Sequence, residues 1–512
     1  MTAAKLPALT KIVAKFAGLP WYLQWLLASV LSLCLYFPIL TNSFVSDDFL
    51  VIKKVVADRQ LNTDGFFRPL SDITIFLNYL VGGLHPFVYY LTGILLHALS
   101  GVLLLRLCVR WQWAATKQRQ QAFALLAMLL FMTYPFHNEA VAWILGRGAL
   151  MANTLGLAAL LILVGRAGEG RKIAGVCACY FIGLTAYETI IVLPVLIIVY
   201  LWFTKAGSRS LLKWTVALLL ATVVHVIVRI IVSGYFFGNY GEGFFNNTIT
   251  GYVVQGVKAF GRVLLPPLDQ PGVLIAAASV LFVALCFLTN RALKKVRDTA
   301  GAKTFFYTVA VFFIVAMIIP AVAAVSTRTS ESDRFLHFPS FFYCMLLAFI
   351  LINLFRYTQW LVVITLLITG YHIYFLEKNN QNWQKASAAV TEILYSVTSS
   401  SGKQGVYVVN LPGEIDGAFV FRRGFKEALQ LNGANDRAIV VVNQLTRDDE
   451  LQLPDTIAAV QQPDGIFIPP FALVKIASQR QNVSTVDSNK VQVSVLVSDK
   501  IIYWNKKNWV QW

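Results

Sequence analysis

The chain carries few charged residues for its length, and its cysteines show no disulfide pattern. Of its 512 residues only 13% are charged and 57% are hydrophobic, whereas soluble globular proteins carry about 25% charged residues. This deficit excludes an ordinary cytosolic enzyme, a disordered chain and a nucleic-acid-binding protein. The six cysteines all lie inside or beside apolar stretches, where we expect buried apolar side chains rather than a disulfide or metal framework.

Long apolar stretches dominate the sequence, and its mean hydropathy is +0.63. Each stretch is about long enough to cross the hydrocarbon core of a bilayer as a helix. The first one, 20–40, is long for the apolar part of a cleavable signal peptide, so we expect an uncleaved span. We predict an α-helical polytopic membrane protein with about eleven spans: 20–40, 86–106, 121–135, 148–165, 172–187, 188–204, 212–233, 271–290, 304–325, 336–355 and 359–376.

The distribution of charge predicts the orientation of these spans. The net charge is +17, yet residues 401–512 hold 12 Lys/Arg against 11 Asp/Glu, so the excess of positive charge lies in the membrane part. Short basic loops gather on one side, as the positive-inside rule requires of the cytoplasmic face. The other side collects carboxylates: Asp47, Asp48, Asp58, Asp64, Asp72, Glu139, Glu188, Glu242, Asp269, Glu331 and Asp333. We therefore expect a cytoplasmic N-terminus, an outer C-terminal region and no nucleic-acid partner.

The pattern predicts a membrane domain over 1–378, a connecting helix over 379–400 and a soluble α/β domain over 401–512. Two long outer loops, 41–85 and 233–270, interrupt the membrane domain, and each contains a segment of helical character. Gly and Pro punctuate the C-terminal region between short runs, as in a small domain rich in strands. The strand-like runs are Val406–Asn410, Ala438–Asn443, Gly465–Ile468, Val491–Val497 and Lys500–Trp504, and Gly424–Leu431 is a helical candidate.

The first outer loop holds a pair of acidic residues and an arginine near the membrane surface. Asp47 and Asp48, in Ser46-Asp47-Asp48-Phe49, could supply a general base or hold a divalent metal. The alternative is that one of them caps the next helix. Arg68 could hold a phosphate bidentately, or it could be an interfacial arginine that reaches toward the headgroups.

Further charged residues follow other spans on the same predicted side. His137 and Glu139 are two residues apart and could form a metal or acid–base pair, or simply end a helix. Glu188 lies in a short turn between apolar helices, so it requires a partner, for which Arg147 or Arg229 is available. No single one of these residues indicates function. Their predicted convergence on one face of the membrane does.

The last such group stands at the outer start of the tenth span. Asp333 and Arg334 could form a structural salt bridge, or Arg334 could be another phosphate ligand.

Taken together, these segments resemble the GT-C superfamily of membrane glycosyltransferases, which use polyprenyl-phosphate sugars. The resemblance is closest to the protein O-mannosyltransferase-like branch, which includes transmembrane O-mannosyltransferases that carry TPR repeats. It rests on Ser46-Asp47-Asp48-Phe49, Phe67-Arg68-Pro69-Leu70, Tyr134-Pro135-Phe136-His137-Asn138-Glu139-Ala140-Val141-Ala142-Trp143, Gly146-Arg147 and Ser332-Asp333-Arg334-Phe335-Leu336-His337-Phe338-Pro339-Ser340.

The resemblance implies roles for these residues. Asp48 or Asp47 would be the catalytic base or a metal contact. The cations that bind the donor phosphate would be Arg68, Arg147 and Arg334, and the residues that shape the donor or acceptor pocket would be His137, Glu139, Glu188 and Asp333.

The chain also departs from the TPR-bearing branch. It has no TPR array, it has Tyr187-Glu188 where those relatives tend to have a Lys-Glu pair, and it has His337 where a Tyr is expected. The second departure puts an ion-pair role of Glu188 in doubt.

We expect a glycosyltransferase that moves a sugar from an undecaprenyl- or dolichyl-phosphate carrier to an acceptor hydroxyl at the outer membrane face, with inversion. Its partners would be membrane lipids, the lipid-linked donor and a protein, lipid or glycan acceptor. No cofactor is certain, although Asp47 and Asp48 could hold a divalent metal. A bacterial inner membrane with a periplasmic C-terminal domain is the expected location.

Two alternatives come from other classes. A transporter or flippase of a lipid-linked sugar should carry broken helices and charges near mid-membrane, where His97, His225 and Arg229 are the main candidates. A scaffold that recruits partners through its C-terminal domain would leave the loop carboxylates and arginines without a role.

Overall fold

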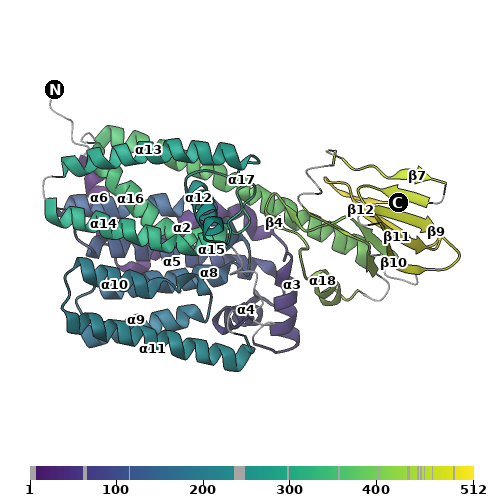
Figure 1. Cartoon of the computed structure of the whole chain (residues 1–512), viewed down its shortest axis with the longest axis horizontal. Helices are drawn as coiled ribbons and strands as arrows, with labels where there is room; N and C mark the ends of the chain where they lie inside the picture. Colours follow the sequence, from purple (N-terminus) through teal and green to yellow (C-terminus); the bar gives the residue numbers. More distant parts are fainter. Residues whose placement is uncertain are drawn as a thin grey trace. The chain divides into compact units, whose positions relative to one another are not determined.

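The chain forms two compact units in a computed structural model, one of residues 1–40 and 61–380 and the other of residues 41–60 and 381–512 (Figure 1). We call them unit 1 and unit 2. The structure describes residues 7–61, 66–114, 116–235, 248–296, 299–355, 358–399, 404–434, 439–446, 449, 453–454, 456–463, 465–487 and 490–512.

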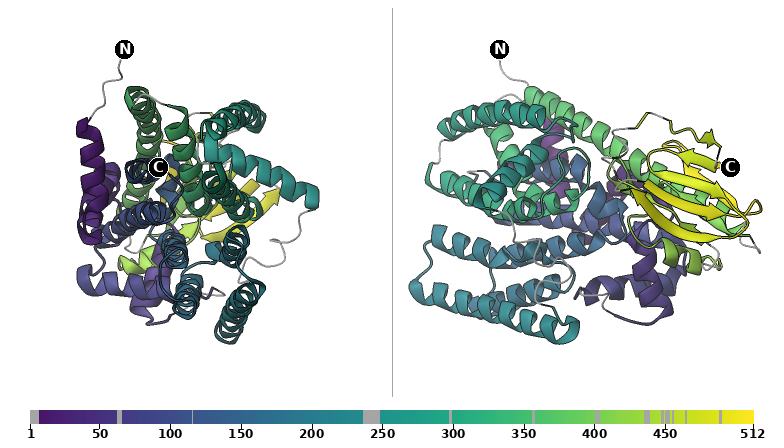
Figure 2. Two further views of the ribbon diagram at one scale, coloured as in Figure 1. Left: turned by 90° about the vertical axis from the view of Figure 1, so that its left-hand side faces the viewer. Right: turned by 45° about the vertical axis from the view of Figure 1, so that its right-hand side comes forward.

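Unit 1 is built from helices, many of which run alongside one another in both views of Figure 2. In chain order they are α1 (Pro7–Gly18), α2 (Trp21–Tyr36), η1 (Phe37–Thr41), α4 (Pro69–Gly82), α5 (Pro86–Arg110), α6 (Lys117–Met132), η3 (Pro135–His137), α7 (Asn138–Ala142), α8 (Arg147–Leu163), α9 (Glu169–Leu184), η4 (Glu188–Ile190), α10 (Leu193–Phe203), α11 (Ser208–Ser233), α12 (Ile249–Leu264), α13 (Pro271–Lys295), α14 (Thr299–Ala316), α15 (Ile318–Val322), η7 (Asp333–Leu336), α16 (His337–Leu354) and the first part of α17 (Thr358–Thr398).

Each of the eleven predicted spans overlaps a helix of the described residues. Within the described residues, seven helices are long and apolar enough to cross a membrane, or eight if one bent pair is a single span. Others are too short for that criterion, since α6 and α9 have 16 residues each and α10 has 11. The predicted class, an α-helical multi-pass membrane protein with a C-terminal domain that contains strands, is therefore confirmed. The count of eleven spans stays a prediction.

Local sequence explains where several helices begin and end. Pro86 and Pro271 stand in the first turn, where a missing backbone N–H costs nothing. Thr116 and Thr248 cap the next helix by accepting a hydrogen bond from the backbone N–H three residues on. Gly234 ends α11 in the left-handed conformation. The apolar faces of these helices then pack around a core rich in phenylalanine, with Phe123, Phe131, Phe312, Phe341 and Phe342 fully buried.

One apolar segment of unit 1 is sharply bent. Residues Pro135–Ala142 and Arg147–Leu163 would pass as one span, but they turn by 113° at the break between them. Gly146 permits the turn, because a Cβ at this position would overlap the backbone carbonyl of Glu139. The bend follows directly on His137 and Glu139 and leads into Arg147, three of the predicted site residues.

The last predicted span and the predicted connecting helix form one continuous helix. α17 runs for 41 residues without a break. Its residues up to Asn380 belong to unit 1, and those from Gln381 belong to unit 2.

Unit 2 combines two main sheets with short helices. One sheet has the order β13-β12-β1-β5, in which β1 pairs in parallel with both neighbours, and the other has the order β10-β11-β9-β8-β7. The helices of this unit are α3 (Asp47–Ile52), the π-helix η2 (Lys53–Ala57), the last part of α17 and α18 (Phe425–Leu431). The strands are β1 (Val406–Val409), β2 (Leu411–Pro412), β3 (Glu414–Ile415), β4 (Ala418–Phe419), β5 (Ile439–Val441), β6 (Gln444–Leu445), β7 (Val460–Gln462), β8 (Gly465–Ile468), β9 (Ala472–Ile476), β10 (Gln481–Asp487), β11 (Lys490–Val495), β12 (Lys500–Trp504) and β13 (Trp509–Gln511).

The structure divides the predicted outer loop 41–85 between the two units. Residues 41–60 fold with the C-terminal region, where the backbone N–H of Ser46 donates to the carbonyl of Val420 at 2.8 Å. Phe49 stacks on Phe421 with ring centroids 6.0 Å apart. The remainder of the loop includes α4, which belongs to unit 1 and supplies the helical segment expected in this loop.

The cysteines correct one expectation. Cys108 and Cys344 are buried, but Cys34 and Cys286 are exposed and the other two are intermediate. Exposed apolar side chains are common on helices of this kind, because a lipid tail covers them as well as protein does. All six cysteines are free thiols.

Candidate functional site

Arg68, Glu188 and Arg229 form a cluster in unit 1, which we call the Glu188 cluster. Arg68 donates from Nη2 to Glu188 Oε2 at 3.0 Å, and Arg229 Nη1 lies 2.9 Å from Glu188 Oε1. The three residues come from the turn before α4, from η4 and from α11. The doubt about an ion-pair role of Glu188 is thus removed, and of the two partners considered for it the structure selects Arg229.

The Glu188 cluster carries more positive than negative charge. Two guanidinium groups face one carboxylate, so these three side chains together carry a charge of +1. The side chains of Arg68 and Glu188 are 18% and 28% exposed, and that of Arg229 is 7% exposed. Positive charge that is partly exposed at the edge of apolar helices is suited to an anion such as a phosphate.

Tyr187 connects the Glu188 cluster with a second ion pair. Its ring lies under the guanidinium of Arg68, 3.9 Å from ring centroid to Cζ. Its hydroxyl accepts a hydrogen bond from Arg334 Nε at 3.1 Å. The tyrosine that stands where a lysine was expected therefore contacts two predicted phosphate ligands.

Arg334 pairs with Glu139 rather than with its neighbour Asp333. Arg334 Nη1 donates to one carboxylate oxygen of Glu139, and the backbone N–H of Arg334 donates to the other at 2.9 Å. The side chain of Glu139 is fully buried and that of Arg334 is 9% exposed. This bond joins α7 to η7, through two residues separated by 195 positions.

Asp333 is held by Arg262, a residue that the sequence analysis did not single out. Arg262 Nη2 donates to both carboxylate oxygens, at 2.7 and 2.6 Å. Its other nitrogens donate to the carbonyls of Ser326 and Leu265 at 3.0 and 2.6 Å. The side chains of both ion-pair partners are at most 1% exposed. α12 also contains Lys258 and other polar residues, so its sequence alone did not mark Arg262 as the residue with a buried acidic partner.

Arg147 is buried at the start of α8. It donates to the carbonyls of Ile144 and Tyr89, at 3.1 and 2.9 Å, and to the side-chain oxygen of Asn78. The residue is 1% exposed. These bonds fix the bend that follows Glu139 against α4 and α5.

His137 lies among other buried histidines. Its ring centroid is 5.1 Å from that of His97 and 4.5 Å from that of His337, and all three residues are fully buried. The structure thus brings together two histidines that the resemblance segments contain, and it adds His97 from α5.

Asp47 and Asp48 belong to unit 2. Asp48 is fully buried and accepts a hydrogen bond from the backbone N–H of Val45 at 3.1 Å. Asp47 opens α3, and its carboxylate lies 3.4 Å from Arg422 Nη2. The N-cap of α3 is Ser46, so neither aspartate caps this helix, although Asp48 accepts from a backbone N–H just before it.

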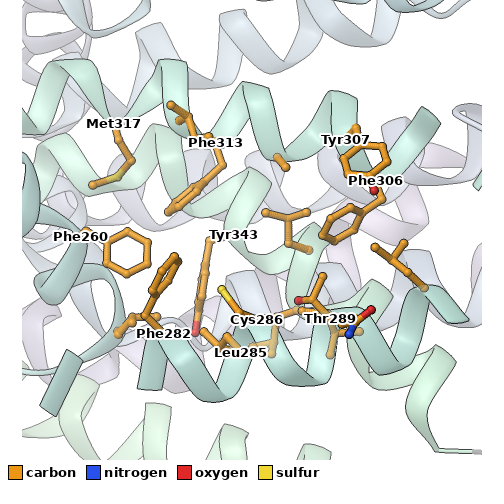
Figure 3. Close-up of a pocket in the computed structure, with 18 of the residues that line it drawn as sticks. Phe260, Phe282, Leu285, Cys286, Thr289, Phe306, Tyr307, Phe313, Met317 and Tyr343 are labelled. Carbon is orange, nitrogen blue, oxygen red and sulfur yellow. The ribbon is translucent and has the colours of Figure 1, made fainter. Parts of the chain in front are cut away.

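A largely apolar cavity of about 570 Å³ lies in unit 1 among helices that could cross a membrane (Figure 3). Phe260 of α12, Phe282 and Leu285 of α13, Phe313 of α14 and Tyr343 of α16 line it. Its polar edge is formed by Thr289 and Asn290 of α13. Such a lining favours a hydrocarbon chain over a polar solute.

The chain was compared with known proteins, and no family model matches it. Part of the chain is similar to proteins named Protein O-mannosyl-transferase. TMTC3 of Mus musculus is 28% identical over 196 residues, which are 32% of this chain and 20% of that protein. TMTC1 of Homo sapiens is 36% identical over 95 residues, 19% of this chain and 10% of that protein. The protein tmtc2 of Xenopus laevis is 32% identical over 155 residues, which are 27% of this chain and 18% of that protein.

The matched part thus spans a fifth or less of the length of these relatives. The resemblance to the TPR-bearing transmembrane O-mannosyltransferases is confirmed.

Among solved structures, that of ArnT from Cupriavidus metallidurans bound to undecaprenyl phosphate is similar, with a TM-score of 0.48 and 12% sequence identity. The similarity covers 86% of this chain and 92% of that chain.

Proposed function

We propose that the chain is a membrane glycosyltransferase that moves a sugar from a polyprenyl-phosphate donor to an acceptor hydroxyl. The observation that carries this proposal is the Glu188 cluster, a site of net charge +1 at the edge of the apolar helices. The similarity to proteins named O-mannosyl-transferases supports a hexose such as mannose as the sugar. The charge bias of the loops supports catalysis at the outer face of the membrane, and a bacterial inner membrane is the proposed location.

The charge of the Glu188 cluster suits the leaving group. A polyprenyl-phosphate sugar is a phosphodiester with one negative charge, and the released polyprenyl phosphate is a monoester whose second pKa is near 6. Negative charge on the phosphate therefore grows as the bond to the sugar breaks. A fixed cluster of net charge +1 stabilises that growing charge more than it stabilises the bound donor, which is the condition for catalysis. We assign Arg68 and Arg229 to the phosphate.

The other predicted arginines take supporting roles in this proposal. The guanidinium groups of Arg334 and Arg147 each donate several hydrogen bonds to groups of unit 1, which occupy their N–H groups. We propose that Arg334 acts through Tyr187, whose ring supports Arg68. Arg147 would hold the bend beside Glu139.

The acceptor hydroxyl must lose a proton, and a carboxylate is the expected base. We propose Asp47 or Asp48 for this role on the resemblance of Ser46-Asp47-Asp48-Phe49. A single displacement of the phosphate would invert the anomeric centre of the sugar. The same two carboxylates are also the proposed site for a divalent metal if the enzyme requires one. The apolar cavity beside Phe260 and Phe282 would receive isoprenoid units of the donor.

The test is a transfer assay on the full chain in nanodiscs with a panel of polyprenyl-phosphate sugars. We expect turnover with at least one donor, a loss of about 10²–10⁴-fold in one of Asp47→Asn and Asp48→Asn with donor binding retained, and weaker donor binding in Arg68→Ala. Arg328→Ala, an exposed arginine on the same predicted side, is the matched control. NMR of the product determines the anomeric configuration of its linkage and so tests whether the transfer inverts it. Absence of turnover with every donor would contradict the proposal.

The bent segment favours a second candidate, a transporter or flippase of a lipid-linked sugar. A span broken by 113° between Pro135–Ala142 and Arg147–Leu163 is of the kind that transporters use at substrate sites. Movement of a fluorescent lipid-linked sugar across proteoliposomes, without sugar transfer and unaffected by the Asp47 and Asp48 variants, would establish this function instead.

A further inference from the structure

Three histidines meet in the interior of unit 1, and we call them the histidine cluster. His97 lies in α5, His137 ends η3 and His337 begins α16. Each offers one ring nitrogen, and these three nitrogens lie within 4.8 Å of one another. All three residues are fully buried. The cluster therefore joins three segments that are far apart in the sequence.

Hydrogen bonds determine which nitrogen of two of these rings carries the proton. His97 Nε2 lies 3.4 Å from the carbonyl of Met132, which can only accept, so Nε2 carries the hydrogen. Ser340 donates its one hydroxyl hydrogen to the carbonyl of His337 at 2.7 Å. Its oxygen, 2.8 Å from His137 Nε2, must then accept from that ring. In both rings Nδ1 is left with a lone pair, and neither Nδ1 has a hydrogen-bond partner in the described part of the chain.

His337 is held from its other side. Its Nδ1 lies 3.2 Å from the side-chain amide of Asn153, and its Nε2 has no hydrogen-bond partner among the described residues. Thr189 donates to the oxygen of that amide at 2.7 Å. The two orientations of an amide differ only by the exchange of its oxygen and its nitrogen. With the oxygen toward the ring, Nδ1 of His337 would carry the hydrogen. Its Nε2 would then have a lone pair, like Nδ1 of the other two histidines.

We propose that the histidine cluster binds a transition-metal ion through His97 Nδ1, His137 Nδ1 and His337 Nε2. Imidazole nitrogens suit zinc, copper, iron and nickel. His97 and His137 donate from their second nitrogen to a carbonyl and a hydroxyl, as metal-ligating histidines usually do, and the Asn153 amide accepts from His337 in the same way once it is reversed. Binding would draw the nitrogens inward, because Zn–N bonds are about 2.0–2.1 Å long.

The surroundings determine what kind of ion fits. Phe131 contacts all three rings, with centroid distances of 5.2, 4.7 and 5.4 Å, and shields them from water. Neutral histidines do not compensate the charge of an ion, and burial of a divalent charge costs more than burial of a monovalent one. Zn²⁺ and Cu⁺ are therefore the two probes, and their relative retention measures this cost.

The ion would position the ion pair at the bend. His137 precedes Glu139 by two residues, and His337 follows Arg334 by three. An ion on both histidines would fix the two segments that the Glu139–Arg334 bond also joins. In this proposal the histidines act on that pair through the backbone and contact neither the Glu188 cluster nor the cavity. The metal site can therefore be tested independently of the proposed transferase activity.

The test measures metal in the full chain, produced in medium with added Zn²⁺ or Cu⁺ and purified in detergent. We expect about one ion per chain by mass spectrometry, with X-ray absorption showing nitrogen ligands. His97→Gln, His137→Gln and His337→Gln should each retain at least about ten-fold less metal. The matched control is His225→Gln, because His225 is also a buried histidine whose Nδ1 has no partner among the described residues, but it lies outside the cluster.

A gain-of-affinity variant guards against loss by misfolding. Asn153→Asp supplies a carboxylate that accepts from His337 Nδ1 without an amide reversal, so it should hold the ion about 10-fold longer against a chelator. A wild-type chain that holds no ion after growth in either metal would overturn the proposal. Equal metal in the wild type and the three histidine variants would overturn it too, since the ion would then be bound elsewhere.

Discussion

The carboxylates of unit 1 occupy two kinds of surroundings. Glu139 and Asp333 are each held by one arginine, and their side chains are 0% and 1% exposed. Glu188 faces two arginines and is 28% exposed. The first kind is balanced in charge and buried, whereas the second has two arginines for one carboxylate and is partly exposed at Arg68 and Glu188. The comparison teaches that charge balance and access, rather than residue type, separate a structural arginine from one that can bind an anion.

The physical reason lies in the cost of burying charge. A buried pair that is fully hydrogen-bonded leaves no free energy for a ligand, and removal of one partner exposes the other to an apolar interior. A partly exposed cluster with one surplus charge can exchange water for a phosphate at little cost. Variants of the two kinds should therefore fail in different assays.

The largest effect is expected from breaking a balanced pair. Asp333→Asn leaves the guanidinium of Arg262 buried without its counter-charge, so the free energy of unfolding should fall by about 3–5 kcal/mol. Thermal and denaturant unfolding in nanodiscs measures this change. The double variant Arg262→Met/Asp333→Leu should recover most of the loss, because it removes both charges. A loss below about 1 kcal/mol in Asp333→Asn would contradict the assignment.

The next effect concerns binding rather than stability. Arg229→Gln removes one cation from the Glu188 cluster, and we expect the Kd for a polyprenyl phosphate to rise about 10–100-fold, as for loss of a hydrogen bond to a charged group. The unfolding midpoint should change little, since Arg68 still pairs with Glu188. Arg328→Gln is the control. If Arg229→Gln unfolds the chain as Asp333→Asn does, the two kinds of surroundings are not distinct.

A smaller effect, of opposite sign, is expected at the carboxylate of the same cluster. Glu188→Gln raises the net charge of the cluster from +1 to +2. Donor phosphate should then bind more tightly, by about 1 kcal/mol or roughly five-fold, with an increased dependence on salt. Isothermal titration at two ionic strengths measures both. Weaker binding would show that Glu188 is needed to orient the two arginines.

The smallest effect extends the comparison to unit 2, at an ion pair whose arginine is 43% exposed and whose carboxylate is buried. Arg480 donates to Asp499 at 2.5 and 3.0 Å, and its guanidinium holds the pKa of Asp499 below its ordinary value. A carboxylate whose pKa is lowered by folding stabilises the protein at pH values above its pKa in the unfolded chain, near 3.9. This stability is lost as the pH falls through its pKa in the folded protein. Hydrogen exchange of β1 and β12 in the full chain should therefore accelerate below about pH 4.

Asp499→Asn supplies the control for this pH effect. The variant should exchange faster at neutral pH and should lose that part of the acid dependence, because the amide does not titrate. An unchanged acid dependence in the variant would assign the effect to other carboxylates of unit 2.

Local sequence predicted much of the fold. The eleven apolar ranges each overlap a helix, because twenty apolar residues without a break have few other stable conformations in lipid. The strand-like runs at 406–410, 465–468 and 500–504 coincide with β1, β8 and β12. The split of loop 41–85 could not be predicted, because the bond between Ser46 and Val420 joins residues whose local sequences do not indicate each other.

The candidate site was predictable in its members but not in its pairings. Glu139, Glu188 and Arg334 were identified because ionisable residues beside apolar helices are costly and therefore informative. That Arg334 pairs with Glu139, and Asp333 with Arg262, depends on contacts across 195 and 71 residues. His97 was recognised as an exception within a span, but its place beside two other histidines follows only from helix packing.

The sequence by itself determined the membrane class and the positions of the helices, since hydropathy acts locally along the chain. The tertiary structure alone decided which charges neutralise one another, that Glu188 receives two arginines and that three histidines share one dry interior. The reason is that burial and net charge belong to a group of side chains in space, and one dielectric environment is shared by residues from distant segments.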